Sequence, residues 1–181
     1  MEIGYHRHHS SFRDPDGFVF SNENKIIYRQ LNQSYKEHYL FLKNSGLYEQ
    51  LVNNKKLISH QEIDDVIYEK KNHFKTILPE QISFISYPYE WCFDQLKDAA
   101  LLTLDIMKQS LNFGMILKDA TPFNVQFHNG KCVFIDTSSF EKYVDGSFWI
   151  AYRQFCEGFL APLLLSHYSG NDLNKIFGNF S

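Results

Sequence analysis

The stretch FDQLKDAALLTLDIMKQSLNFG, residues 93–114, is the sequence feature that most narrows the possible folds. Its apolar side chains recur every three or four residues, which is the spacing of one face of an α-helix. Gly114 stands where a helix commonly ends in a left-handed residue. At about 1.5 Å per residue such a helix is about 30 Å long, so we expect the central buried helix of one small domain. The predicted buried row is Phe93, Leu96, Ala100, Leu104, Met107 and Leu111, widened by Ala99, Leu102 and Ile106.

The residues that follow this helix predict a β-hairpin. Asn129-Gly130 is a strong tight-turn signal between the strand-like runs NVQFH and KCVFID. Asp119 and Asn124 lie at the entrance of the first strand, and Asp136 lies at the exit of the second. Because the entrance and exit of a hairpin are neighbours, we expect these three polar side chains to meet at one end of it.

Two carboxylates and an amide in one small volume are typical of a metal–phosphate site. Carboxylates held close together repel one another unless a proton or a cation lies between them. Mg²⁺ takes a few protein oxygens and completes its shell with phosphate and water. The alternative interpretation is that the three residues only open and close turns and strands, as Asp and Asn often do.

The first half of the chain predicts a small α+β unit. The runs GFVF and KIIYRQL have strand composition, and the polar SNEN between them supplies a turn. A helix is expected through QSYKEHYLFLKNSGLYEQLVNN, with an interruption at Gly46. A further strand is expected in ILPEQISFISYPYEW, where the chain crosses to the second half. The predicted fold class is α+β.

Composition excludes several classes of protein. The net charge of −3 and the lack of a Lys/Arg block argue against nucleic-acid binding. The three cysteines form no C-x-x-C pair, which favours reduced thiols over disulfides or zinc. The N-terminus lacks the apolar core of a signal peptide, and the longest apolar run, FLAPLLL, is too short to span a bilayer. We therefore expect a soluble, cytoplasmic protein without a membrane partner.

The pattern D-x-x-x-x-N, a hairpin and then Ile-Asp resembles the catalytic segment of the protein-kinase-like fold, as found in aminoglycoside phosphotransferases and related small-molecule kinases. The resemblance implies two lobes, residues 1–86 and residues 87–181, that bind Mg²⁺ and ATP. It implies Asp119 as the catalytic base for a small-molecule hydroxyl, with Asn124 and Asp136 as metal ligands. Arg29 would take the place of the phosphate-binding Lys, paired with Glu37 or Glu49.

Two further segments of the second half have alternative interpretations. SYPYEWCF, residues 86–93, carries alternating aromatic side chains that favour a buried strand face, and Glu90 is its polar residue that would face a nucleotide or substrate. The apolar run SFWIAYRQFCEGFLAPLLL predicts a helix that ends or kinks near Pro162. Its stripe of Trp149, Tyr152, Cys156 and Phe159 is either core or a docking surface.

A longer resemblance extends over nearly all of the chain. Segments such as FRDPDGFVF, YRQLNQSY and GMILKDATPFNVQF are similar to the N-terminal region of a bacterial family labelled class I S-adenosylmethionine-dependent methyltransferases or nodulation-type proteins. That family places a methyltransferase domain after this region. No G-x-G turn for S-adenosylmethionine occurs here, and 45 residues after Asp136 are few for a kinase C-lobe, so we expect a truncated C-lobe and no such cofactor site.

Two functions follow from these resemblances. The first is a kinase-like Mg²⁺-nucleotide-binding module that transfers a phosphoryl group to a small-molecule hydroxyl. The second is a non-catalytic scaffold for a methyltransferase domain or protein. Departures from the kinase pattern favour the second: Leu117 replaces the usual His, and Thr137-Ser138 replace Phe-Gly.

Overall fold

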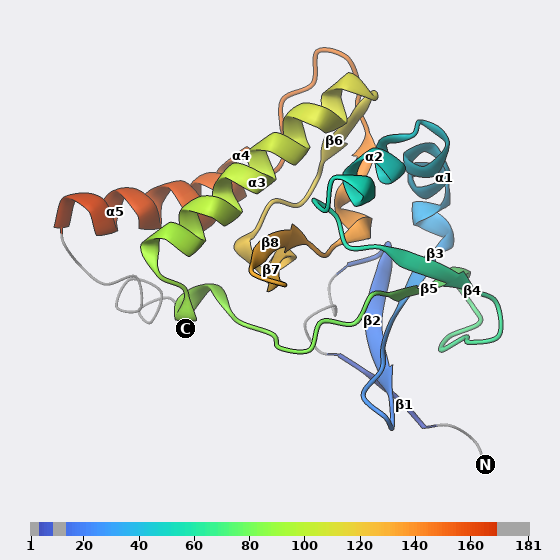
Figure 1. Cartoon of the computed structure of the whole chain (residues 1–181). Helices are drawn as coiled ribbons and strands as arrows, with labels where there is room; N and C mark the ends of the chain where they lie inside the picture. The colour runs from blue at the N-terminus through green and yellow to red at the C-terminus, as the bar shows by residue number, and fades with distance from the viewer. Residues whose placement is uncertain (1–3, 9–13, 170–181) are drawn as a thin grey trace.

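A computed structural model describes residues 4–8 and 14–169 of the chain. Its first half is built on a five-stranded antiparallel sheet, drawn at the right of Figure 1. The predicted hairpin is confirmed, because β2 and β3 pair with Phe20 opposite Tyr28. The strands lie in the order β1 (Tyr5–Arg7), β2 (Gly17–Asn22), β3 (Ile27–Asn32), β5 (His73–Pro79) and β4 (His60–Ile63).

Two helices, α1 (Lys36–Asn44) and α2 (Leu47–Asn53), connect β3 to β4. Gly46 separates them at φ 86°, a left-handed conformation that glycine adopts at little cost. The predicted interruption at Gly46 is therefore confirmed. Both helices bury one face, so the segment packs against the rest of the fold rather than standing free.

The predicted central helix is confirmed as α3 (Phe93–Asn112), and Gly114 follows it at φ 69°. Its predicted buried row is partly wrong, because Leu104 and Leu111 are 41% and 43% exposed. Thr103 and Ser110 are buried instead, since each hydroxyl donates to the carbonyl four residues earlier, at 2.8 Å. A search for apolar spacing alone misses such hydroxyl residues.

The second half holds two short antiparallel pairs. The predicted hairpin is confirmed: β7 (Val125–His128) pairs with β8 (Lys131–Phe134) through a turn whose two residues, Asn129 and Gly130, both have positive φ. In the other pair, β6 (Met115–Leu117) lies beside β9 (Phe140–Lys142). The ends of both pairs bring residues 117–124 close to residues 135–140.

The strand expected between Ile77 and Trp91 is wrong in its extent. The observed strand β5 begins earlier, at His73, and ends at Pro79. Most of the remaining segment has no strand partner, and a short 3₁₀ helix, η3, spans Pro88–Glu90. Phe84 and Ile85 are exposed there, so their composition reflects an apolar connector rather than a buried strand.

The last described segment is helical, but not as one regular helix. It consists of α4 (Tyr152–Phe155), a π-helical turn over Cys156–Leu160, and α5 (Ala161–Ser169). The helical run continues through Pro162, and the π-helical turn lies directly before it, which agrees with the expected kink near this proline. Phe155 and Phe159 are buried while Tyr152 is 60% exposed, so the predicted stripe is shifted toward Phe155.

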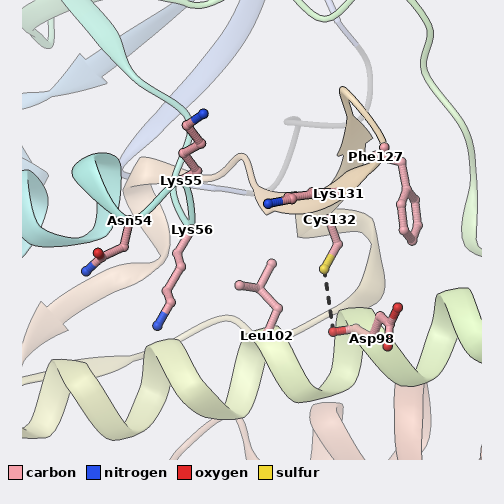
Figure 2. Close-up of a pocket in the computed structure, with 9 residues that line it drawn as sticks. Asn54, Lys55, Lys56, Asp98, Leu102, Phe127, Lys131 and Cys132 are labelled. Atoms are coloured by element: carbon pink, nitrogen blue, oxygen red, sulfur yellow. Dashed lines mark hydrogen bonds between the residues drawn. The ribbon is translucent and has the colours of Figure 1, made fainter.

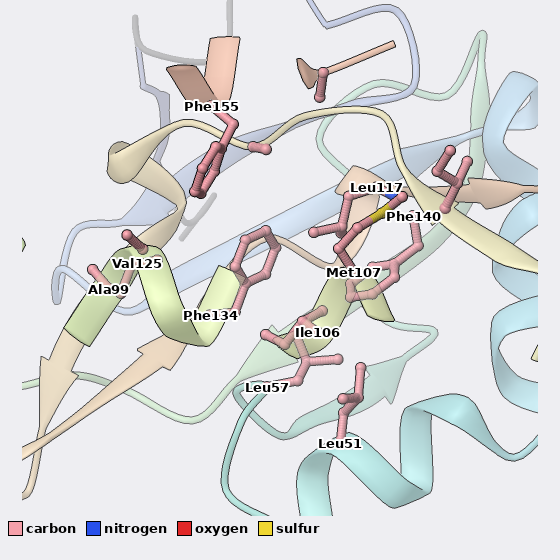
Figure 3. Packing of buried hydrophobic residues seen from close by; sticks show 14 of the residues in the cluster. Leu51, Leu57, Ala99, Ile106, Met107, Leu117, Val125, Phe134, Phe140 and Phe155 are labelled. Carbon is pink, nitrogen blue, oxygen red and sulfur yellow. The ribbon is translucent and has the colours of Figure 1, made fainter. Parts of the chain in front are cut away.

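The largest core cluster joins the two halves of the chain, as the close packing in Figure 3 illustrates. Leu51 and Leu57 from the first half belong to the same cluster as Ile106 and Phe134 from the second half. Residues on both sides of the expected lobe boundary at 86 and 87 therefore share one core cluster. In the part of the chain that the structure covers, no helix combines the length and apolar character needed to cross a membrane.

Candidate functional site

The structure brings Asp119, Asn124 and Asp136 together. The backbone N–H of Lys118 donates to the Ser139 carbonyl at 2.8 Å, and that of Ile135 donates to the Asn124 carbonyl at 2.8 Å. These bonds hold the residues before the hairpin against those after it. Side chains link the same two segments. Asn124 Nδ2 donates to Ser139 Oγ at 3.2 Å, and Ser139 Oγ donates to Asp136 Oδ2 at 2.8 Å.

Asp136 is buried, and both of its carboxylate oxygens accept hydrogen bonds. Oδ1 accepts from the Ser138 N–H at 2.9 Å and from Ser138 Oγ at 2.7 Å, and it also forms an ion pair with Arg29. Burial alone would raise the pKa of Asp136, but the Arg29 guanidinium and the bonds from Ser138 and Ser139 lower it below its ordinary value. Protein hydrogen-bond donors and the Arg29 charge thus take the place of water around the Asp136 anion.

Arg29 lies on β3 and carries its charge across to the residues that follow β8. Its side chain is only 15% exposed, and it donates to Ser138 Oγ as well as pairing with Asp136. The expected pairing with Glu37 or Glu49 is wrong. Glu37 turns toward β9, where its carboxylate lies 3.5 Å from Lys142 Nζ, and Glu49 is exposed on α2.

Asp119 lies beside this pair but forms no ion pair among the described residues. Burial, followed by the negative charge of Asp136, raises the pKa of Asp119. Its Oδ1 accepts from the Thr121 N–H at 3.3 Å. Gln154 of α4 also bonds to it while accepting from the Ala120 N–H at 2.6 Å. A carboxylate with a raised pKa is a better proton acceptor than an ordinary one.

The chain before β2 adds two carboxylates, Asp14 and Asp16, that no sequence motif indicates. Asp16 forms an ion pair with Lys118, the residue before Asp119. Burial would raise the pKa of Asp16, but its hydrogen bonds with Lys118 and Ser34 lower it. Asp14 Oδ2 lies 3.2 Å from Ser138 Oγ. The segment DPDG carried the only signal for these contacts, namely acidic residues next to a turn glycine.

Tyr35 also belongs to this network, through its hydroxyl group. The hydroxyl of this fully buried residue lies 2.7 Å from the Thr137 carbonyl and 2.8 Å from the Phe140 carbonyl, and donates its single proton between them. Burial, and then the charge of Asp136, raises the pKa of Tyr35 well above its ordinary value. The hydroxyl therefore remains protonated and acts as a donor.

Glu90 has a local structural contact instead of facing this centre. Its Oε2 accepts from the Tyr87 N–H at 2.7 Å and so caps the start of η3. The neighbouring rings of Tyr87 and Tyr89 are stacked with centroids 5.3 Å apart, and both are about half exposed. The expected buried aromatic face here is wrong for these two rings, although Trp91 is buried.

The acidic side chains near Asp136 each contact a different protein group of the hydrogen-bond network. Across residues 4–8 and 14–169, no group of three or more His, Cys, Asp or Glu side chains is arranged to hold a metal ion. The donors present on Asp136 are the guanidinium of Arg29, two hydroxyls and one amide N–H. This set already balances the charge of a buried carboxylate, which a Mg²⁺ ion would otherwise do.

Comparison with known proteins gives one informative relationship. No protein-family model matches the chain. The chain is 36% identical over 157 residues to nodulation protein NoeA of Rhizobium meliloti strain 1021. The match covers 86% of this chain and 32% of the relative, so the chain spans about a third of that protein's length. The chain is therefore similar, over most of its residues, to one part of a bacterial nodulation protein.

Proposed function

We propose that this chain is a kinase-like module that acts as a non-catalytic scaffold within a larger nodulation-type system. The observation that carries the proposal is the closed set of donors on Asp136. Four protein hydrogen-bond or ion-pair contacts, from Arg29, Ser138 and Ser139, satisfy both oxygens of the residue that would have to bind Mg²⁺. A metal at Oδ1 would have to displace several of these contacts, and a metal at Oδ2 would compete with the Ser139 hydroxyl.

The order of elements supports the kinase-like part of the proposal. A five-stranded antiparallel sheet with helices between β3 and β4 precedes an irregular connector, the long helix α3 and the β7–β8 hairpin. This is the order that the resemblance to aminoglycoside phosphotransferases implies. Arg29 occupies the strand position expected for the phosphate-binding Lys, and it contacts the Asp expected to hold the metal.

Charge also favours a scaffold over a nucleotide site. Asp14 and Asp16 precede β2, in the segment where a kinase-like enzyme presents glycine-rich backbone to phosphates. They lie against Ser138 and Lys118 respectively, which places two carboxylates beside Asp119 and Asp136. Four carboxylates against two cations, Arg29 and Lys118, make a poor environment for the phosphates of ATP.

The partner proposed for this scaffold is a methyltransferase domain or protein. The support is the resemblance to a family that joins such a domain to this region, together with a relative about three times as long as the matched segment. Within the module, the Arg29–Asp136 ion pair would stabilise the fold, and the outer surface would contact the partner. S-adenosylmethionine would bind the partner and not this chain.

The test of the proposal is phosphoryl transfer and ATP hydrolysis by the purified chain with Mg²⁺. The scaffold proposal predicts turnover no greater than that of an Asp119→Asn, Asp136→Asn double variant. Turnover well above that of the double variant would refute it. Circular dichroism of both proteins shows whether each is folded, so that inactivity is not confused with unfolding.

A second candidate is the Mg²⁺-nucleotide-binding phosphotransferase, and Asp119 favours it. Its pKa is raised by burial and by Asp136, and no Lys or Arg pairs with it in the described segments. On this proposal Asp119 accepts the proton of a small-molecule hydroxyl, Asn124 and Asp136 hold Mg²⁺, and Arg29 moves from Asp136 to the phosphates. An Asp119→Asn variant that still binds Mg²⁺-ATP but loses turnover would support it.

A further inference from the structure

A hollow of about 330 Å³ lies on the side of the molecule formed by the end of α2, the β7–β8 turn and the first half of α3 (Figure 2). Its volume is at the lower end of the range found for small-molecule sites. Three separate parts of the chain meet around it, so a ligand there would contact all three. The lining residues are Asn54, Lys55, Lys56, Asp98, Leu102, Phe127, Gly130, Lys131 and Cys132.

The backbone after α2 is fixed without using the lysine side chains. The N–H groups of Asn54, Lys55 and Lys56 donate to the carbonyls of Gln50, Val52 and Leu51 at 3.1, 2.9 and 2.8 Å. The last carbonyls of α2 are therefore satisfied by backbone donors. The Lys56 carbonyl in turn accepts from the Phe134 N–H at 2.8 Å, which ties this segment to β8.

The lining carries an excess of positive charge. It contains three lysines and one aspartate, and the described contacts of Asp98 with the lining use its backbone carbonyl, which accepts from Cys132 Sγ at 3.6 Å. Lys56 forms an ion pair with Asp105. Lys55 and Lys131 have no carboxylate partner in the described ranges. In Figure 2 Lys131 extends over the hollow and Lys55 stands at its rim.

The rest of the lining is apolar. Leu102 projects into the hollow from α3, and Phe127 borders it from β7. The Phe127 ring is held edge-on by Trp91, with centroids 5.2 Å apart. Burial, and then the charge of Asp98, raises the pKa of the Cys132 thiol, so this sulfur is a neutral packing group rather than a nucleophile.

We propose that this hollow binds a small organic anion, a phosphate or carboxylate on a short apolar body. Lys131 contacts the anionic group, Lys55 adds positive charge at the rim, and the apolar body lies on Leu102 and Phe127. An ammonium group and an apolar wall side by side suit such a ligand better than a bare ion or a neutral one. None of the lining residues belongs to the Asp136 network, and the proposal does not depend on the proposed function.

The test is a titration of the ¹⁵N-labelled full chain, followed by amide chemical shifts, with phenyl phosphate, benzoate, inorganic phosphate and benzyl alcohol. We expect phenyl phosphate or benzoate to move the amide signals of Asn54, Gly130 and Cys132 and to bind more tightly than the other two probes. Preference between phenyl phosphate and benzoate identifies the anionic group. Equal binding of benzyl alcohol, or no localised shifts with any probe, would overturn the proposal.

Matched variants locate the binding group. Lys131→Gln together with Lys55→Gln should weaken binding about five- to tenfold, as expected for two exposed charges. Lys108→Gln removes an exposed lysine of α3 outside the hollow and should leave binding unchanged. Equal weakening by both sets of substitutions would show that the protein's general charge, and not this hollow, attracts the anion.

Discussion

Arg29 of β3 and Asp136, which follows β8, form an ion pair that joins the five-stranded sheet to the hairpin half of the fold. Both side chains are largely buried, with exposed fractions of 15% and 11%. A buried pair of this kind contributes little compared with apolar packing, but removal of one partner leaves an unbalanced charge. The polar centre of the molecule therefore depends on the two residues together.

Replacement of Asp136 by Asn should destabilise the protein in the absence of any ligand. The change leaves the Arg29 guanidinium buried without its counter-charge and weakens the bonds from Ser138 and Ser139. We expect a loss of about 3 kcal/mol in the free energy of unfolding, measured by urea denaturation. A double-mutant cycle with Arg29→Gln should show strong coupling, and additive effects would contradict a direct pair.

Replacement of Tyr35 by Phe should also lower stability. The substitution removes one hydroxyl and leaves the carbonyls of Thr137 and Phe140 without this donor in a buried position. We expect a loss of about 1 to 2 kcal/mol in the free energy of unfolding. Tyr89→Phe is the control, because that ring is 46% exposed. Equal effects of the two substitutions would argue against a role for the Tyr35 hydroxyl.

Protonation of His60 should make stability depend on pH. Its Nε2 lies 3.0 Å from the Tyr39 hydroxyl, which donates to Glu62 Oε1 at 2.7 Å, so Nε2 is the donor toward Tyr39. Its Nδ1 is buried without a partner among the described residues. Burial, and then the charge of Lys43, lowers the pKa of His60 from 6.5 to about 4.

Since the unfolded state binds the His60 proton more readily, stability should be fully present above about pH 6.5 and fall as the pH drops toward 4. The expected loss over this window is roughly 3 kcal/mol. Urea denaturation at several pH values measures it. His60→Gln should flatten the profile between pH 4.5 and 6.5, whereas replacement of the exposed His167 should not. An unchanged slope in His60→Gln would rule out this assignment.

Replacement of Gly158 by Ala should disturb the loop that carries Asp119 and Asn124. A Cβ atom at Gly158 would lie 2.7 Å from Pro122 Cδ, which is closer than side-chain carbons approach. We expect a loss of about 1 to 3 kcal/mol in the free energy of unfolding. Glu157→Ala, next in sequence, removes only an exposed pair with Arg153 and should cost less than about 0.5 kcal/mol. Similar losses would show that the Pro122 contact is unimportant.

Local sequence patterns predict the elements with strong internal signals. The helix over Phe93–Asn112 and the turn at Asn129-Gly130 were predictable because periodicity and turn chemistry act over a few residues. The hairpin also predicts that Asp119, Asn124 and Asp136 converge. The strand expected up to Trp91 was wrong because apolar composition cannot distinguish a paired strand from an exposed connector.

The partners of charged residues were the least predictable part of the site. Arg29 was expected to pair with Glu37 or Glu49, yet it lies against Asp136, since the choice depends on how β3 faces the hairpin half. Contacts of Asp16 and Gln154 were missed for the same reason. Neither residue stands in a motif, and each acts through a neighbour that is distant in sequence.

The most direct test of the account is thermal unfolding of the full chain and of Asp136→Asn, each with and without Mg²⁺-ATP. A ligand that binds only the folded state at a hundredfold excess over its dissociation constant stabilises it by about 2.7 kcal/mol. The scaffold account predicts a lower Tm for Asp136→Asn and no effect of Mg²⁺-ATP on either protein. A rise in Tm with Mg²⁺-ATP that disappears in Asp136→Asn would contradict it and establish a metal–nucleotide site.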